Sequence, residues 1–178
     1  ADDRASHTAL RRIRVSGGLV AVHDEALGRD WRLEGIALDI LRAEQGGLSG
    51  DGEAVLRTPG ATVPVHLSGE ARAEPQRLTA RLDLPVLRPA EIARIWPEAA
   101  ALEALDAPLA IEVTAEMDAA ATPRGIALRL AAPQGGRLAG LPFDGLEARL
   151  TARPDRLDLE SARIAQGGRA LDASGTLH

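Results

Sequence analysis

The chain has no cysteine, no lysine and almost no aromatic side chains. Its 178 residues include two Trp, one Phe and no Tyr, so aromatics make up 2% of the sequence. The absence of cysteine excludes disulfides, thiolate chemistry and cysteine-ligated zinc. The absence of lysine removes the GK[ST] element of a phosphate-binding loop. With so few aromatics there is no stacking platform for single-stranded nucleic acid, and apolar burial must come from Leu, Val, Ile and Ala.

Charge and hydropathy narrow the class of protein further. The net charge of −5 argues against nucleic acid as a partner, because a basic stripe is expected there. No apolar run approaches the length of a membrane-spanning helix, and no signal peptide is visible. We therefore expect the chain to be soluble as written, or a soluble piece of a larger protein. Its length suffices for one domain with a sizeable core.

Apolar and polar residues alternate with a period of two through much of the chain. The pattern is clear in Val63–Ala73, Leu78–Leu84, Ile111–Met117 and Leu146–Ala152. Successive side chains of a strand point to opposite faces, so each segment is apolar on one side and polar or charged on the other. Turn signals separate the segments, among them Ser16-Gly17-Gly18. The sequence therefore predicts about a dozen short strands in an antiparallel meander.

One short motif occurs three times in nearly the same form. The three copies read AEQGG at Ala43–Gly47, APQGG at Ala132–Gly136 and IAQGG at Ile164–Gly168. Glycine supplies positive φ without steric cost, so each Gln-Gly-Gly is interpreted as a hairpin reversal after which an amphipathic strand restarts. A simpler interpretation is that the motif recurs because turns favour glycine, which predicts hairpins but no groove.

Residues 85–108 break the strand pattern and predict a helical insert, with its helix near residues 89–105. Pro89 suits the first helical position, and Ile92, Ile95 and Trp96 would share one side of a short helix. Pro97 interrupts it, and a second helical stretch is expected over 98–105. As one of few large side chains, Trp96 is expected to pack the helix onto the end of the sheet.

The predicted fold is mostly β, with one domain over residues 1–178. Strands are expected over about 10–84 and about 109–177, on either side of the insert. An antiparallel sheet with one apolar face must hide that face in a sandwich, in a closed barrel, or in an open trough covered by a ligand. The residues leave this choice open. The low-volume apolar faces favour an open, curved, groove-like sheet that lines a channel for acyl chains.

No constellation of polar residues predicts an enzyme. His7, His23, His66 and His178 have no metal-binding spacing, and scattered surface histidines are the preferred interpretation. His23-Asp24 would be half of a catalytic triad, yet no GxSxG elbow frames a nucleophile. The stretch Gly46–Glu53 approaches a phosphate loop or a calcium repeat but is better explained as a glycine-bearing hairpin. We therefore expect no catalytic residue, no cofactor and no metal.

The order of these segments resembles the AsmA-like proteins of Gram-negative envelopes, specifically their YhdP-like branch. Arg14–Arg42 resembles a stretch in which a glycine-hydrophobic strand, an Asp and a Trp-led strand follow one another. The next stretch of the resemblance is GGLSGDGEAVL, at Gly46–Leu56. Leu82–Met117 resembles the helix-bearing "Leu-x-Pro … Trp-Pro … Leu-x-x-Leu … Pro" connector, and Arg156–Leu177 resembles a recurrent hairpin. The likeness covers about Leu10–Leu177 of the chain.

The resemblance implies a fragment of a longer repetitive chain that lies in the periplasm and is anchored in the inner membrane by an N-terminal helix missing here. Such proteins form a long apolar β-groove implicated in moving phospholipid toward the outer membrane. The expected partners are phospholipid acyl chains and other envelope proteins, with no nucleic acid. The alternative is a closed β-sandwich that serves as a structural or protein-interaction module of the envelope. The predicted groove lining comprises Val63, Val65, Leu67, Leu82, Leu84, Ile111, Val113, Leu128, Leu130, Leu146, Leu150, Leu157 and Leu159.

Overall fold

The fold is that of a computed structural model, which describes most of the chain. The described residues are 10–24, 29–42, 47–57, 61–72, 77–90, 93, 97–118, 122–153 and 155–177. The expected packing of Trp96, Ile92 and Ile95 lies outside these residues, as do His7 and His178.

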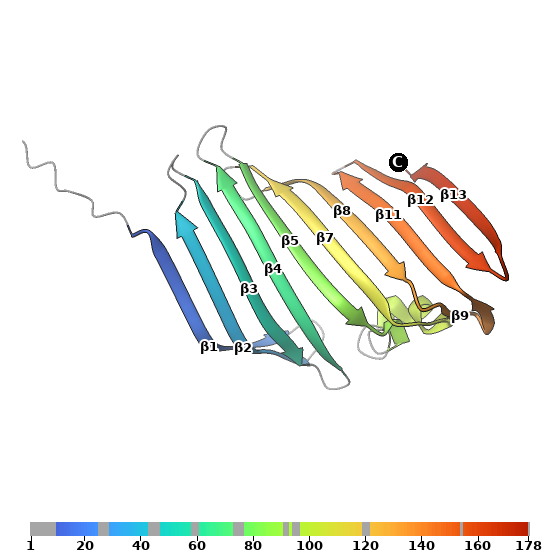
Figure 1. The fold of residues 1–178 in the computed structure, drawn as a ribbon, viewed down its shortest axis with the longest axis horizontal. Helices are drawn as coiled ribbons and strands as arrows, with labels where there is room; N and C mark the ends of the chain where they lie inside the picture. Colours follow the sequence, from blue (N-terminus) through green and yellow to red (C-terminus); the bar gives the residue numbers. More distant parts are fainter. Residues whose placement is uncertain are drawn as a thin grey trace, which may run out of the picture.

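Ten strands form one antiparallel sheet, and each pairs with the next in the order β1-β2-β3-β4-β5-β7-β8-β11-β12-β13 (Figure 1). The strands are β1 (Arg12–Asp24), β2 (Arg29–Arg42), β3 (Leu48–Arg57), β4 (Thr62–Arg72), β5 (Arg77–Leu87), β7 (Leu109–Met117), β8 (Pro123–Ala132), β11 (Gly145–Arg153), β12 (Arg156–Gln166) and β13 (Arg169–Leu177). The sheet does not close on itself, because β1 and β13 stand at its two ends. The predicted antiparallel meander in an open sheet is confirmed.

The strands form where the sequence alternates, and their registers keep the alternation in phase. Leu82 on β5 lies opposite Leu67 on β4 and opposite Val113 on β7. The residue after it, Asp83, lies opposite His66 and Glu112. A shift by one residue would bring apolar and charged side chains to the same face, so burial of one face specifies the register.

The insert between β5 and β7 is only partly as expected. Pro89, Ala90 and Ala93 are helical, but the second stretch is a 3-10 helix over Pro97–Ala104. Leu105, expected to end that helix, instead begins the short strand β6 (Leu105–Asp106), where it pairs with Leu138. This pairing builds a second sheet, β10-β9-β6, from β6, β9 (Gly136–Leu138) and β10 (Leu141–Phe143). The sequence did not predict this second sheet.

The three Gln-Gly-Gly sites differ in structure. Gly167 and Gly168 have φ of 56° and 77° and form a two-residue turn between β12 and β13, as a type I′ hairpin requires. The copy at 132–136 leads into β9, which pairs with β6 and β10 and not with the preceding strand β8, so this copy is not the predicted hairpin reversal. The first copy joins β2 to β3, and its residues 43–46 lie outside the described part of the chain.

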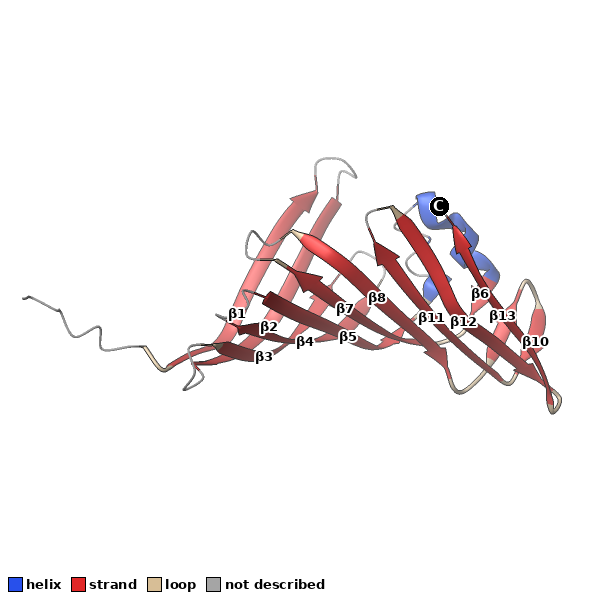
Figure 2. Ribbon diagram, turned by 90° about the horizontal axis from the view of Figure 1, so that it is seen from above, coloured by secondary structure: helices blue, strands red, loops and turns tan. Residues whose placement is uncertain are grey.

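Seen from above, the large sheet is curved and twisted, and the helical insert lies to one side of it (Figure 2). Registers shift within the β1–β2 pair on either side of Gly18, and within the β2–β3 pair between Glu34 and Ala37. Extra residues of this kind bend a strand and increase its twist. The first two strands can therefore turn relative to the middle of the sheet, which gives the sheet a trough-like form.

Candidate functional site

The candidate site is one face of the large sheet, which we call the apolar face. Directly paired residues share a face, so the registers identify its members across the sheet. One row crosses all ten strands: Val15, Leu38, Gly52, Leu67, Leu82, Val113, Leu128, Leu150, Leu159 and Gly175. Every member of the row is apolar or glycine. This face is the surface that the alternation predicts.

The structure brings every predicted lining residue to the apolar face. Besides those in the row, Val65, Leu84 and Leu130 lie on it through their pairing with Ala54, Ile111 and Ala148. The remaining predicted residues join the face through their own pairs: Val63 with Leu56, Ile111 with Leu130, Leu146 with Ala132, and Leu157 with Ala152. All of the predicted lining residues therefore share one face of the sheet.

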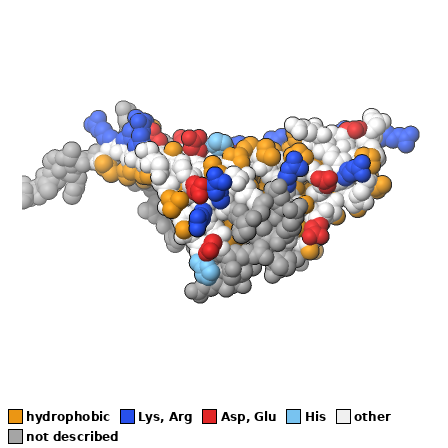
Figure 3. Space-filling model, turned by 90° about the horizontal axis from the view of Figure 1, so that it is seen from below, with side chains coloured by type: hydrophobic (Ala, Val, Ile, Leu, Met, Phe, Trp, Pro, Cys, Tyr) orange, Lys and Arg blue, Asp and Glu red, His pale blue; other side chains and the backbone are white. Residues whose placement is uncertain are grey.

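Much of the apolar face is reachable by solvent. Leu67 near its middle is 48% exposed, Val15 at one end of the row 41%, and Leu157 near the C-terminal end 41%. Val63, in contrast, is only 2% exposed. At the left of the view from below, charged side chains occupy the upper side of the sheet and hydrophobic ones the lower side (Figure 3). Leucines in a sandwich core would be covered by a second sheet, so these exposures are those of an open wall.

One end of the apolar face is covered by the second sheet, β6, β9 and β10, which we call the cap. Phe143 of the cap forms a buried cluster with Ala107, Leu109 and Ala132, and Ile111, Leu146 and Ile164 pack against it. This cluster is the main core of the described chain, and it lies where β7 and β11 begin and β8 and β12 end. The cap therefore covers the apolar face near the ends of these four strands.

Gly136 allows β9 of the cap to lie unusually close to the segment that follows β6. A Cβ atom at this position would lie 2.5 Å from both the Cβ atom of Ala107 and the carbonyl oxygen of Asp106. No side chain fits such a space, so only glycine lets β9 approach the segment after β6 this closely. The second Gln-Gly-Gly copy therefore has a packing role that the turn interpretation of the motif did not predict.

The opposite face is polar and has its own row across the sheet. It runs Arg14, Asp39, Asp51, Ser68, Arg81, Thr114, Ala127, Thr151, Asp158 and Thr176. Ion pairs join side chains on this face, both within a strand and between neighbouring strands. Arg81 contacts Asp83 at 3.0 Å and Glu112 at 2.9 Å, and Arg57 contacts Glu34 at 2.5 Å. None of the described polar or charged residues is buried, so the charges stay on the solvated side.

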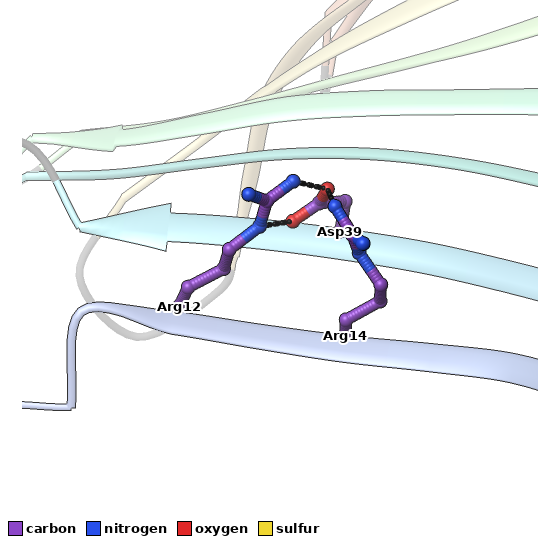
Figure 4. A network of polar contacts seen from close by, with 3 residues as sticks. All are labelled: Arg12, Arg14 and Asp39. Atoms are coloured by element: carbon purple, nitrogen blue, oxygen red, sulfur yellow. Dashed lines mark hydrogen bonds and ion pairs between the residues drawn. The ribbon is translucent and has the colours of Figure 1, made fainter.

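Asp39 has the most strongly shifted carboxyl group on the polar face. Arg12 Nε donates to Asp39 Oδ1 at 2.7 Å, Arg12 Nη2 donates to Oδ2, and Arg14 Nη2 reaches Oδ2 at 3.2 Å (Figure 4). The hydrogen bond from Arg12 is the largest cause that lowers the pKa of Asp39, to about 2. Asp158 shows the same effect, since hydrogen bonds from Arg156 and Thr176 lower its pKa.

An open depression of about 600 Å³ crosses the N-terminal strands, lined mainly by polar-face residues that include Asp39, Asp51, Glu53, His66 and Asp83. No three His, Cys, Asp or Glu residues of the described chain come together in a way that could hold a metal ion. The glycine-rich stretch ending at Glu53 lies largely within β3, where the side chains of Ile40 and Leu38 approach Gly50 and Gly52. Because β3 pairs antiparallel with β2, the stretch belongs to a hairpin, as expected.

His23 pairs with Asp30 through a 2.8 Å contact between Nδ1 and Oδ1, with both side chains largely exposed. The partner of His23 is therefore Asp30 on the neighbouring strand β2. It is not Asp24, the next residue in the sequence, which suggested half of a catalytic triad.

Sequence reasoning missed the part of the apolar face that β1 and β2 supply. Ile13 lies opposite Ile40, Val20 opposite Leu33, and Val22 opposite Trp31, all on the same face as the row. The register shifts in both strands interrupt the period of two, so a search for strict alternation skips these residues. A search that allowed one extra residue at Gly17 or Gly35 would have found them.

Comparison with known proteins leaves the site to be interpreted from its own geometry. No family model, curated protein or solved structure matches the chain. Within the described residues, no helix is both long and apolar enough to span a membrane.

Proposed function

We propose that the chain is a non-enzymatic segment of an apolar β-groove that binds acyl chains and supports phospholipid transport between the inner and outer membranes. The segment would lie in the periplasm, as part of a longer AsmA-like protein anchored in the inner membrane. Its partners would be phospholipid acyl chains and other envelope proteins. The role needs no catalytic group, cofactor or metal, because the groove only shelters the apolar part of the lipid from water.

The observation that carries the proposal is the unbroken apolar row across all ten strands, on a face that the described protein only partly covers. Apolar surface removed from water contributes about 25 cal/mol per Å², so a surface of this extent gains free energy when an apolar chain covers it. Soluble proteins rarely leave large contiguous apolar patches open, and such patches mark sites for ligands, partners or membranes.

The form of the surface favours an extended, flexible ligand over a compact one. The row is made of aliphatic side chains and glycine, and the midpoint residues Leu67, Leu82 and Val113 offer no hydrogen-bond donor or acceptor. Small-molecule sites usually add a few precisely placed polar groups that fix orientation. A surface without them suits alkyl chains, which need only apolar contact and can slide along it. The charged groups on the opposite face keep that side in water.

The decisive measurement is lipid binding by the purified chain. Organic extracts of protein purified from a Gram-negative host should contain phospholipid by mass spectrometry, and the lipid-free protein should take up a fluorescent phospholipid. Consistent absence of both would overturn the proposal.

A matched pair of variants on β8 locates the site. Leu128→Asp places a carboxylate in the middle of the row, whereas Ala127→Asp places the same group one residue earlier, on the polar face beside Thr114 and Thr151. We expect Leu128→Asp to reduce lipid uptake at least tenfold, and Ala127→Asp to leave it unchanged. Circular dichroism checks that both are folded. Leu67→Asp, at a more exposed position of the same row, provides a second apolar-face variant.

Equal uptake by the folded Leu128→Asp and Ala127→Asp variants would place lipid elsewhere and reject this face as the site. The closed sandwich alternative has no support from the described sheet, which is open. Under that alternative, Leu67→Asp would bury an unpaired carboxylate and the protein would fail to fold.

A further inference from the structure

In four places, two arginines lie directly opposite each other on neighbouring strands of the large sheet. Like charges in directly opposite positions destabilise a sheet. An anion beside them relieves this repulsion, so the surroundings of each pair show whether the chain itself supplies one. The pairs in the described registers are Arg32 with Arg57, Arg72 with Arg77, Arg129 with Arg149, and Arg153 with Arg156.

Three of the four pairs have a carboxylate from the chain. The fourth pair, Arg129 on β8 and Arg149 on β11, has none: among the described residues, no side chain forms an ion pair or a hydrogen bond with either guanidinium. Both arginines are exposed on the polar face. The carboxylates at the other pairs are Glu34 at Arg57, Glu70 at Arg72, and Asp158 at both Arg153 and Arg156.

The carboxylates on the strands beside this fourth pair are engaged elsewhere. Glu112 on β7 lies opposite Arg129, yet its Oε2 accepts a hydrogen bond from Arg81 Nη2 at 2.9 Å. Glu160 on β12 accepts a hydrogen bond from Thr151 at 2.6 Å. Neither carboxylate therefore neutralises the two guanidiniums.

Glu147 is the nearest carboxylate along β11, on the same face as Arg149. It lies opposite Arg163 on β12, and Arg163 is also 3.8 Å from Asp172. Glu147 and Asp172 therefore flank an arginine of their own, and the positive charge of the pair Arg129–Arg149 stays in excess.

We propose that Arg129 and Arg149 form a binding site for a phosphate group in its doubly charged form. Cβ atoms of directly opposite residues are about 4.5–5.5 Å apart, so two guanidiniums can reach one anion between them. Each guanidinium presents a planar fork of donors that matches two oxygens of a phosphate. Two positive charges match a phosphate dianion, and its tetrahedral oxygens can serve both forks.

The surroundings of the pair leave room for such a ligand. On β8 the neighbours of Arg129 on the polar face are Ala127 and Ala131, whose side chains are a single methyl group. On β12 the residue opposite Arg149 is Ser161, an exposed residue whose hydroxyl is a further donor. β8, β11 and β12 each have a paired strand on both sides, so the site lies within the sheet (Figure 1).

The site lies on the face of the sheet opposite to the apolar row, in which Leu128 and Leu150 occupy the same strands. A lipid held on the apolar face is separated from it by the sheet, so the inference does not rest on the proposed function. The phosphate can belong to a soluble phosphomonoester or to the phosphomonoester headgroup of phosphatidic acid in a membrane. The chemistry of recognition is the same for both sources.

Titration with inorganic phosphate tests the site. NMR signals of the arginine Nε–H groups are followed at about pH 8, where phosphate is mainly the dianion, with ionic strength held constant by sodium chloride. We expect the signals of Arg129 and Arg149 to shift together along one saturable curve. At about pH 5.5 phosphate carries a single charge and the arginines are unchanged, so binding should be severalfold weaker.

A matched pair of variants separates a site from general attraction to positive charge. Arg149→Gln should weaken phosphate binding about tenfold, because it removes the charged donors of one fork. Arg163→Gln removes the same charge from the neighbouring strand, at an arginine that already has Asp172, and should leave the affinity unchanged. Both side chains are exposed, so we expect both variants to fold, as circular dichroism would verify.

Sedimentation with phosphatidylcholine vesicles, with and without phosphatidic acid, identifies the source of the phosphate. Binding that needs phosphatidic acid and is lost in Arg149→Gln would assign the site to a membrane surface, whereas phosphate binding without it would assign a soluble phosphomonoester. The proposal is overturned if the two signals show no saturable shift, or if Arg163→Gln weakens phosphate binding as much as Arg149→Gln. Lipid uptake by Arg149→Gln should equal that of the unmodified chain, so failure of this site is distinguishable from failure of the proposed function.

Discussion

The guanidinium of Arg12 on β1 donates to both carboxylate oxygens of Asp39 on β2, and Arg14 donates to one of the same oxygens. The contact joins the outermost strand to the rest of the sheet on the polar face (Figure 4). Because one carboxylate accepts hydrogen bonds from two arginines, the conformational entropy lost by the Asp39 side chain is shared between two interactions.

This relationship predicts how the attachment of β1 depends on pH. The pKa of Asp39 is lowered from 3.8 to about 2, chiefly by the hydrogen bond from Arg12. A lowered pKa means that the carboxylate stabilises the folded state above pH 3.8, and that this contribution is lost as the pH falls through about 2. NMR titration of the Asp39 carboxyl group measures the shift directly.

The matched variant for this titration is Asp39→Asn, which removes the charge and keeps the size. Between about pH 4 and pH 2 we expect the thermal midpoint of this variant to change less than that of the unmodified chain. The reason is that the paired carboxylate of Asp39 becomes protonated in this range, whereas asparagine does not titrate. An Asp39 that titrates at its usual 3.8 would show that the contact with Arg12 does not persist in solution.

The cap should depend on Phe143. This side chain is 4% exposed and forms the centre of the buried cluster with Leu109 and Ala132. Phe143→Ala should lower the free energy of unfolding by about 3–5 kcal/mol, because it removes a large buried side chain and leaves a cavity. Leu141→Ala, on the same short strand but at a residue 71% exposed, should change it by less than about 0.5 kcal/mol. Denaturant unfolding measures both; equal effects would mean that the cap does not pack as described.

The turn between β9 and β10 contains a residue in an unfavourable conformation. Ala139 has φ of 50° and is followed by Gly140 with φ of 83°. A left-handed backbone is costly for a residue with a Cβ atom, so Ala139→Gly should raise the free energy of unfolding by about 0.5–1 kcal/mol. Gly140→Ala should lower it by about 1–2 kcal/mol for the same reason. Thermal melting of the two variants measures both changes. A shift of the melting temperature in the same direction for both would contradict the described turn.

The sequence predicted the large sheet well because its signal is local. Alternation in segments such as Leu78–Leu84 fixes both the strand and the face to which each leucine belongs, and pairing with a sequence neighbour then aligns the faces. The apolar side of the candidate site could therefore be predicted from β4 to β12 without knowledge of the fold.

The cap and the first two strands could not be predicted in the same way. The cap depends on residues distant in sequence, since Leu105 pairs with Leu138 and Gly136 approaches Ala107. Its strands of two or three residues are too short to show a period. In β1 and β2 the extra residues near Gly17 and Gly35 shift the phase, so Val15 and Val22 share a face despite their odd separation. Non-local pairing and bulges are the two features that a period of two does not detect.

The order of the strands also bears on how the chain folds. In the large sheet each strand pairs with the one that precedes it, and β7–β8 and β11–β13 continue the same rule after the cap segments are set aside. Pairing of near neighbours needs only short loops to close, which favours rapid folding and lets order spread from one hairpin to the next. A chain leaving the ribosome can therefore add one strand at a time to a growing edge. Each newly added strand covers the edge that the strand before it had left exposed.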